Sequence, residues 1–304
     1  MKNLLTIISF SIFLFSCAEK ETVSNGLEGV WKKIGTTIYK DGKPSDTLSP
    51  MYDRTNKNDR EGYQYKIYSK KNVTWLRRVT NLDSAGNNMS YGTGASGTYE
   101  VKNDTLFEIL KQGVDRWREI YNEGRVFKFA LNTNQNNFEQ FRIDEQGNGF
   151  GELYERIDTY NQSNLLSGVY KRDATLVYEK NKVVDTLSSF TNSPNFKMKL
   201  ILTDNFYSLI WNYDRLDSLG NDTFDVRMIL ANATYDNSRQ YLSIVAGLRP
   251  ITNQWREKFN NKRERDIGLT DDNNLLMGLL GSSASSGSLD EDGNGRKAYF
   301  KRIE

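Results

Sequence analysis

Tryptophans stand beside arginines at three places in the sequence, and this combination could bind a small molecule. An aromatic face next to a guanidinium group suits an amphipathic or anionic ligand, or a sugar ring. Tryptophan is also a common core residue, so a packed core would explain the same pattern. The candidate ligand-binding residues are Trp75, Arg77, Trp117, Arg118, Trp255 and Arg256.

The side chains that most enzymes use for catalysis are scarce. The sequence contains no histidine and a single cysteine, Cys17, which excludes Ser-His-Asp triads, Cys-His nucleophiles and histidine-ligated zinc. A carboxylate pair of the kind that glycosidases use remains. Glu152 with Glu155, and Asp290 with Glu291, are such pairs, but acids beside turns and on strand faces are ordinary surface residues. We therefore expect a protein without enzymatic activity and without a cofactor.

An acidic turn, D290-E-D-G-N-G295, resembles part of a calcium-binding loop. An EF-hand loop has oxygen ligands at positions 1, 3 and 5, glycine at 6 and glutamate at 12, between two helices. Lys301 stands at position 12 here, and the related turn D144-E-Q-G-N-G149 has Gln146 in place of the acid at position 3. The pattern favours a hairpin turn, in which Asp, Asn and Gly tolerate positive φ, and no metal site is predicted.

The two acidic turns belong to a long internal repeat. L27-E-G-V-W-K-K33 returns as L166-S-G-V-Y-K-R172, N81-L-D-S-A-G-N-N88 as R215-L-D-S-L-G-N-D222, and Y154-E-R-I157 as F300-K-R-I303. The offset moves from 139 to 134 and then to 146 residues, which indicates small insertions in loops. A unit of this length can hold its own core, so the sequence predicts two tandem domains, residues 27–158 and 166–304, joined by a linker, 159–165.

Short alternating segments fill each copy. Between the turn signals, apolar and polar residues alternate with the period of a half-buried strand. Seven or eight such strands within 130 residues, with short connections, fit an antiparallel up-and-down barrel better than a sandwich. We therefore expect an all-β chain of two tandem barrels. On an alternating strand Trp75 and Arg77 face one way and Leu76 and Arg78 the other, and because one face must meet solvent, we expect some of these arginines to be surface residues. The segments of the first copy are 36–39, 63–68, 73–76, 97–101, 105–109, 126–131 and 137–143.

The ends of each copy resemble the lipocalin, or calycin-like, pattern. G29-V-W31 opens the first strand and an arginine stands on the last strand. The resemblance implies that Arg156 packs across Trp31 at the closed end of barrel 1, and that Arg302 packs across Tyr170 in barrel 2. A guanidinium group over an aromatic face contributes roughly 0.5–2 kcal/mol. The chain is most similar to small lipocalin-like domains of Bacteroidota envelope lipoproteins.

The first residues differ in kind from the rest. Lys2 precedes an apolar run from Leu4 to Phe15, which is shorter than the roughly 20 residues that span a bilayer and reads as a secretory signal. L14-F-S-C17 resembles the bacterial lipoprotein signal, which implies cleavage after residue 16 and acylation of Cys17, with 17–26 as a tether. Ala18 after the cysteine favours the outer membrane. The alternative is a free thiol or an intermolecular disulfide at Cys17.

The charge composition limits the classes of molecule that the chain can bind. Lys and Arg number 41 against 39 Asp and Glu, without a long basic block, so the chain lacks the footprint of a nucleic-acid-binding protein. No glycine-rich phosphate loop joins a strand to a helix. Two functions remain: an anchored protein that binds a small hydrophobic or amphipathic molecule, or a structural module whose filled barrels bind envelope proteins or glycans. A barrel of about eight strands is compatible with both.

The lipid anchor makes the first prediction. Cys17→Ser removes the acylated thiol, so the variant should appear in the soluble periplasmic fraction while the parent chain sediments with membranes. Fractionation followed by immunoblotting checks it, with Ser16→Ala as a control that keeps a small residue before Cys17. Continued membrane association of Cys17→Ser would contradict the lipoprotein assignment.

Overall fold

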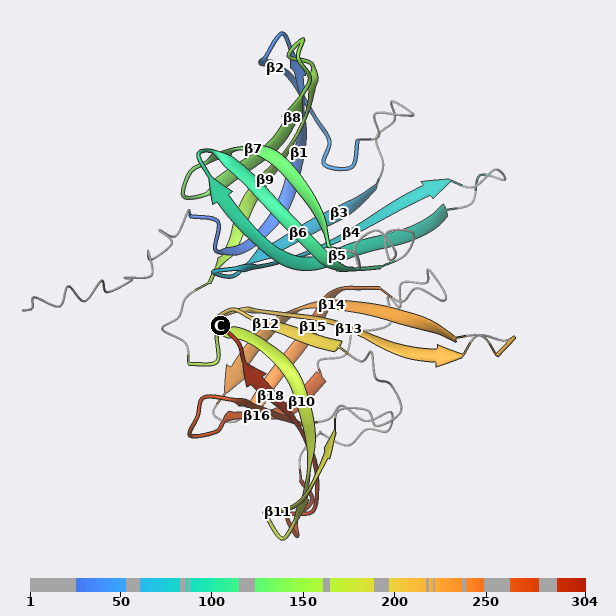
Figure 1. Ribbon diagram of the computed structural model, residues 1–304, viewed down its shortest axis with the longest axis vertical. Coiled ribbons are helices and arrows are strands. Elements are labelled where there is room, and N and C mark those ends of the chain that lie inside the picture. Colours follow the sequence, from blue (N-terminus) through green and yellow to red (C-terminus); the bar gives the residue numbers. More distant parts are fainter. Residues whose placement is uncertain are drawn as a thin grey trace, which may run out of the picture.

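The computed structural model places two all-β barrels side by side in one chain (Figure 1). Each of the seven segments expected in the first copy lies within a strand, and the prediction of two tandem antiparallel up-and-down barrels is confirmed. The described residues are 26–52, 61–82, 86, 88–114, 124–160, 165–188, 197–216, 219–220, 222–236, 239–248, 263–278 and 289–304.

Barrel 1 is a meander of nine antiparallel strands that closes on itself. β1 pairs along its length with β9, with β3 at its N-terminal half and with β2 at its C-terminal half. The closed ring is therefore β1 with β3–β9, and the β1–β2 hairpin projects from it (Figure 1). The strands are β1 (Gly29–Lys40), β2 (Lys43–Leu48), β3 (Glu61–Tyr68), β4 (Asn72–Leu82), β5 (Asn88–Lys102), β6 (Thr105–Gly113), β7 (Arg125–Thr133), β8 (Asn137–Ile143) and β9 (Gly149–Thr159).

Barrel 2 repeats this topology, with β10 in the place of β1 and β18 in the place of β9. Its pairing is thinner between β15 and β16, between β16 and β17, and between β17 and β18, where three or four residue pairs join the strands, so this barrel is nearly closed. The strands are β10 (Gly168–Glu179), β11 (Lys182–Ser188), β12 (Lys197–Leu202), β13 (Phe206–Leu216), β14 (Asp222–Asp236), β15 (Arg239–Leu248), β16 (Arg263–Leu269), β17 (Leu275–Gly278) and β18 (Gly295–Arg302).

Turn chemistry explains the short connections. The β1–β2 turn has Asp41 at φ 49° and Gly42 at φ 74°, as a two-residue turn with both central residues at positive φ requires. In each copy the acidic turn contacts the hairpin formed by the first two strands. In barrel 1 the Gly42 amide of the β1–β2 turn donates to the Gly147 carbonyl oxygen at 2.9 Å, and in barrel 2 the Asn181 amide of the β10–β11 turn donates to the Gly293 carbonyl oxygen at 2.9 Å. The projecting hairpins are thus hydrogen-bonded to the β8–β9 turn in barrel 1 and to the acidic turn before β18 in barrel 2.

One end of barrel 1 is covered by the aromatic–arginine pair that the sequence resemblance implies. Trp31 is fully buried and its indole N–H donates to the Leu27 carbonyl oxygen at 2.6 Å. The centre of the Arg156 guanidinium group lies 4.1 Å from the centroid of the Trp31 ring, and its nitrogens donate to the carbonyl oxygens of Glu28 and Gly26. This arginine therefore ties the chain before β1 across the end of the barrel, which we call the closed end.

Barrel 2 has the same arrangement with tyrosine in place of tryptophan. The Tyr170 hydroxyl donates to the Leu166 carbonyl oxygen at 2.9 Å, and the centre of the Arg302 guanidinium group lies 5.6 Å from the Tyr170 ring centroid. Arg302 also donates to the carbonyl oxygens of Leu165 and Ser167. The cation–π distance is longer here, so the backbone hydrogen bonds carry more of the closure.

The two barrels share a buried apolar layer. The outward faces of β3 and β4 meet those of β12 and β13, with contributions from β1, β10 and β14 (Figure 1). Equivalent residues of the two copies meet there, so the layer has approximate two-fold symmetry. Its buried members are Val30, Ile67, Leu76, Val114, Tyr160, Val169, Ile201, Phe206, Ile210, Met228 and Leu230.

This layer corrects the expectation of half-buried strands. In β3, Gln64 and Lys66 are buried on the barrel interior while Ile67 is buried between the barrels. In β4, one face was expected to meet solvent, but Trp75 packs on the interior cluster and Leu76, on the opposite face, is 3% exposed within the same layer. Packing of one barrel on the other has replaced solvent on the outer face of these strands.

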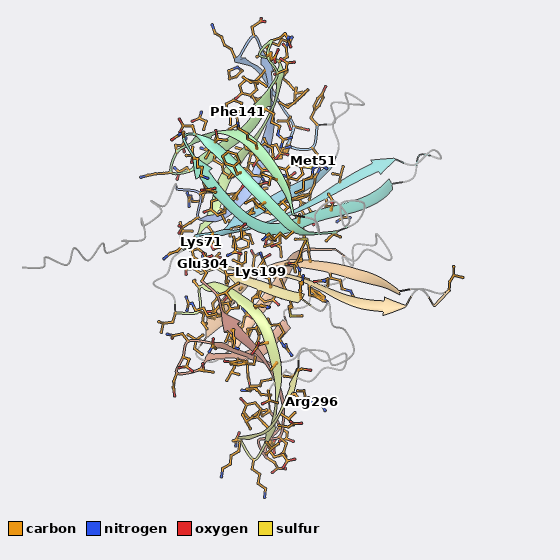
Figure 2. All side chains as sticks on the ribbon, viewed as in Figure 1. Met51, Lys71, Phe141, Lys199, Arg296 and Glu304 are labelled. Carbon is orange, nitrogen blue, oxygen red and sulfur yellow. The ribbon has the colours of Figure 1, made fainter. Side chains whose placement is uncertain are left out.

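Two carboxylates, one from each barrel, form hydrogen bonds across the junction between the barrels. Asp158, at the end of β9, accepts hydrogen bonds from the Thr203 hydroxyl at 2.6 Å and the Asn205 side-chain amide at 2.9 Å, in the β12–β13 turn. Glu304, beyond β18, accepts from the backbone amides of Lys70 and Lys71 and from the Asn72 side chain, in the β3–β4 turn. Figure 2 shows Lys71 and Glu304 together at the junction. Each barrel thus holds a turn of the other.

The junction predicts a stability effect. Asp158→Ala leaves the Thr203 hydroxyl and the Asn205 amide without their acceptor, so the free energy of unfolding should fall by about 1–3 kcal/mol. Urea unfolding followed by tryptophan fluorescence measures it. The matched control is Asp173→Ala, which removes an exposed ion pair with Lys301 and should change stability by less than about 1 kcal/mol. Equal effects of the two variants would contradict the clamp.

Candidate functional site: the interior of barrel 1

Trp75 and Arg77 lie on the interior face of β4. Trp75 packs against the apolar cluster that fills the closed end, with Trp31 and Phe138 among its members. Arg77 lies opposite Gln64 of β3 in the strand register and is close enough to Glu152 to lower the pKa of that carboxyl group. The structure therefore brings this predicted pair inside barrel 1, the tryptophan in the core and the arginine above it.

The other predicted aromatic–arginine residues, Trp117, Arg118, Trp255 and Arg256, lie outside the described residues.

A buried charged group occupies the middle of the barrel. The Lys66 ammonium donates to Glu108 and to the Gln140 side-chain oxygen, both at 2.6 Å. Glu108 also accepts from the Tyr68 hydroxyl at 2.5 Å. The side chains of Lys66 and Glu108 are 2% and 3% exposed, so each charge depends on the other for compensation. Burial first, and then Glu108, raises the pKa of Tyr68 well above its usual range, and the phenol stays a donor.

A second group centres on Glu152. This carboxylate accepts from the Gln140 side-chain amide and from the Tyr154 hydroxyl, both at 2.8 Å, and forms an ion pair with Lys33 at 3.3 Å. Gln64 completes the group through a hydrogen bond to the Tyr154 hydroxyl at 2.5 Å. Gln140 also binds Lys66, and therefore both groups form one continuous polar network across β1, β3, β6, β8 and β9.

The charges of the network set opposite protonation tendencies. Burial alone would raise the pKa of Glu152, but the positive charges of Lys33 and Lys66 outweigh it and lower the pKa to about 2. Burial lowers the pKa of Lys33 despite Glu152, because that lysine is only 5% exposed and Arg77 and Lys66 repel its charge. The contrast follows from the neighbours, since three positive groups surround Glu152 whereas Lys33 has one carboxylate beside it and two positive groups that oppose its charge.

Among the described side chains of the interior network, positive charges outnumber negative ones by one. Lys33, Lys66 and Arg77 face Glu108 and Glu152, and the Nε atom of Arg77 is buried without a hydrogen-bond partner. A buried guanidinium N–H without an acceptor is costly. The site can therefore accept an anionic or hydrogen-bond-accepting group at Arg77.

An aromatic rim continues from this network away from the closed end. Two residues beyond Gln140 on β8, the centre of the Arg142 guanidinium group lies 4.3 Å from the Phe129 ring centroid. Arg125 lies 5.2 Å from the Phe127 ring, and the two phenylalanines pack on the interior cluster. Both arginines are exposed, so the rim presents positive charge above apolar surface.

Sequence reasoning missed this network. It considered Glu152 only as a catalytic partner of Glu155, but positions an odd number apart on a strand face opposite sides. Glu152 points inward, whereas Glu155 lies near Tyr65 of the layer between the barrels. The residues from Asp290 to Asn294 form a tight turn, in which the Asp290 carboxylate accepts from the Asn294 amide at 2.6 Å. No cluster of three or more potential metal ligands occurs among the described residues.

No family model, curated protein or solved structure matches the chain. The repeat therefore supplies the comparison, with barrel 2 as the reference for barrel 1.

The interior of barrel 2 is apolar where that of barrel 1 is polar. The strand pairings place Lys66 beside Trp31 and Leu200 beside Tyr170, and they pair Gln140 with Glu152 and Met277 with Ala298. Met198 and Trp211 pair where Gln64 and Arg77 pair in barrel 1. Both barrels keep their closed ends, so the difference concerns the interior and not the scaffold.

The low pKa of Glu152 gives a testable pH dependence. Its ionised form favours the folded state, so this contribution is complete above the ordinary pKa near 4.5 and is lost as the pH falls toward about 2. Glu152→Gln should flatten the decline of unfolding free energy across this window, measured by urea unfolding at successive pH values. Glu155→Gln, on the opposite face of β9, is the control. An unchanged pH slope in Glu152→Gln would show that the carboxylate is not coupled to the network.

Proposed function

We propose that this protein is a lipid-anchored binding protein of the bacterial cell envelope, and that barrel 1 holds a small amphipathic molecule with an anionic or strongly accepting polar group. The observation that carries the proposal is the excess positive charge inside barrel 1, with the buried Arg77 Nε lacking an acceptor. The polar group of the ligand supplies this acceptor. Charge-assisted hydrogen bonds of this kind are worth about 1.5–3 kcal/mol.

The rim supports an amphipathic ligand over a purely polar one. Phe127 and Phe129 stack at 6.5 Å with an interplanar angle of 12° and offer apolar surface beside Arg142. A ligand with its acceptor at Arg77 and its apolar part along these rings meets both kinds of surface. Aromatic surface with few convergent polar groups is typical of small-molecule sites.

The position of the chain entry agrees with an anchor at Cys17. The Gly26 carbonyl oxygen is bound by Arg156 at the closed end of barrel 1, so a tether that precedes Gly26 starts from the end opposite the rim. An acylated Cys17 would then hold the closed end toward the membrane and leave the rim accessible from the aqueous side. Among the described residues no helix is long and apolar enough to cross a bilayer.

The alternative is a structural module with filled barrels. It draws on the dense packing at the closed end, where Trp31 contacts Phe138 edge-on at 4.8 Å and Phe138 stacks on Tyr154 at 4.5 Å. This packing fills the lower layer of barrel 1. The charged layer above it favours the binding function, since a barrel that is only structural gains little from buried charges.

Native mass spectrometry tests the proposal on the chain without residues 1–17, purified from its own host. We expect a co-purifying small molecule that is lost, or bound about 10- to 100-fold more weakly, in Arg77→Met, which corresponds to about 1.5–3 kcal/mol. Arg296→Met, at an exposed arginine, is the matched control. An apo mass for the parent chain under several growth conditions would favour the structural module.

A further inference from the structure

Arg172 of β10 is a buried cation inside barrel 2. It is 7% exposed, and the centre of its guanidinium group lies 5.3 Å from the ring centroid of Phe300, a core residue of this barrel. One terminal nitrogen donates to the Thr175 hydroxyl at 2.6 Å, and Nε is buried without a hydrogen-bond partner. Within the described part of the chain, no carboxylate forms an ion pair with Arg172.

The repeat shows which counter-ion is missing. Lys33 pairs with Tyr154 across β1 and β9, and Arg172 pairs with Phe300 across β10 and β18. Two residues before Tyr154 stands Glu152, the ion-pair partner of Lys33. Two residues before Phe300 stands Ala298, which is 3% exposed in the same core. Barrel 2 has kept the cation and replaced its carboxylate with a methyl group.

The surroundings of Arg172 are apolar and built from smaller side chains than those of barrel 1. Leu200 stands in the place of Lys66, Leu202 in that of Tyr68, and Ala298 in that of Glu152. Both rings have eight strands, and at these three positions barrel 2 has the shorter side chain. Met198 and Trp211, which are half-buried on β12 and β13, extend the apolar surface beyond the core.

A buried charge without a counter-ion destabilises the folded protein, and a bound anion removes this destabilisation. Burial lowers the pKa of Arg172 to about 10, so the side chain remains charged at neutral pH and an anion would still balance its charge. Water would satisfy Nε but would leave the charge unbalanced.

We propose that barrel 2 is a second binding site, in which Arg172 binds the anionic head of an amphiphile, a carboxylate or a phosphate monoester, whose apolar chain lies among Leu200, Met198 and Trp211. This inference deepens the proposed function, since it assigns barrel 2 its own ligand class. Barrel 1 balances its equivalent cation internally, so the two sites differ in chemistry.

The test uses the chain without residues 1–17 and three probes of equal chain length: a fluorescent long-chain fatty acid, its alcohol, and the matching alkyl phosphate. The parent chain should bind the acid at least about 10-fold more tightly than the alcohol, as loss of one charge-assisted contact implies. Two variants should bring the acid to the level of the alcohol: Arg172→Met, which removes the cation, and Ala298→Glu, which supplies the counter-ion of barrel 1. Arg172→Lys should retain part of the preference.

The controls separate this inference from the proposed function. Lys33→Met alters the equivalent cation of barrel 1 and should leave acid binding by barrel 2 unchanged, and circular dichroism verifies that each variant folds. Phosphate binding that depends on Arg172 would support the site and define its head group. Acid binding that survives both Arg172→Met and Ala298→Glu in an Arg77→Met background, in which the anion site of barrel 1 is removed, or no binding of any probe, would overturn the inference. The proposed function would still stand if barrel 1 released its native ligand in Arg77→Met.

Discussion

The apolar layer between the barrels is the constraint on which the rest of the structure depends. A lone barrel of this size must bury its apolar residues inside, because its outer face meets water. Here β3 and β4 bury Ile67 and Leu76 on their outer faces against Ile201 and Ile210 of barrel 2. Apolar burial contributes about 25 cal/mol per Å² on either face of a strand. With part of that stabilisation moved outside, the interior of barrel 1 can hold charged groups such as Lys66 and Glu108.

The architecture was predictable because it rests on local signals. Alternation located the strands, and turn residues such as Asp41 and Gly42 located the hairpins. The direction in which each face points was not predictable from one copy, since a period of two is the same whether the polar face meets solvent or the interior. In β3, Gln64 and Lys66 point inward, and Ile67 on the opposite face lies against barrel 2.

Comparison of the two copies position by position contains the missing signal. Ile67 and Ile201 are apolar in both copies and lie in the shared layer, whereas Lys66 became Leu200 inside the barrel. A strand position that is apolar in both copies indicates a contact that both barrels make. The neighbouring position, which is lysine in one copy and leucine in the other, faces the interior, and the two interiors differ. Arg77 was predicted as a site residue because of its aromatic neighbour Trp75. The network around it, formed by Gln64, Glu108, Gln140 and Glu152, was not predicted.

Electrostatics then determines how far the two interiors can share a ligand. Lys33 and Arg172 occupy equivalent positions, and burial lowers the pKa of both. In barrel 1 Glu152 forms an ion pair with Lys33, so an incoming anion must be bound elsewhere, at Arg77. In barrel 2 Ala298 stands in the place of Glu152, so Arg172 has no equivalent carboxylate beside it. A molecule that satisfies Arg172 among leucine and methionine side chains would leave the amides of barrel 1 without partners, and unpaired buried polar groups discriminate strongly between ligands. The two copies therefore place different interiors on one scaffold, and the exchange of Glu152 for Ala298 is the one that removes the counter-ion of the shared cation.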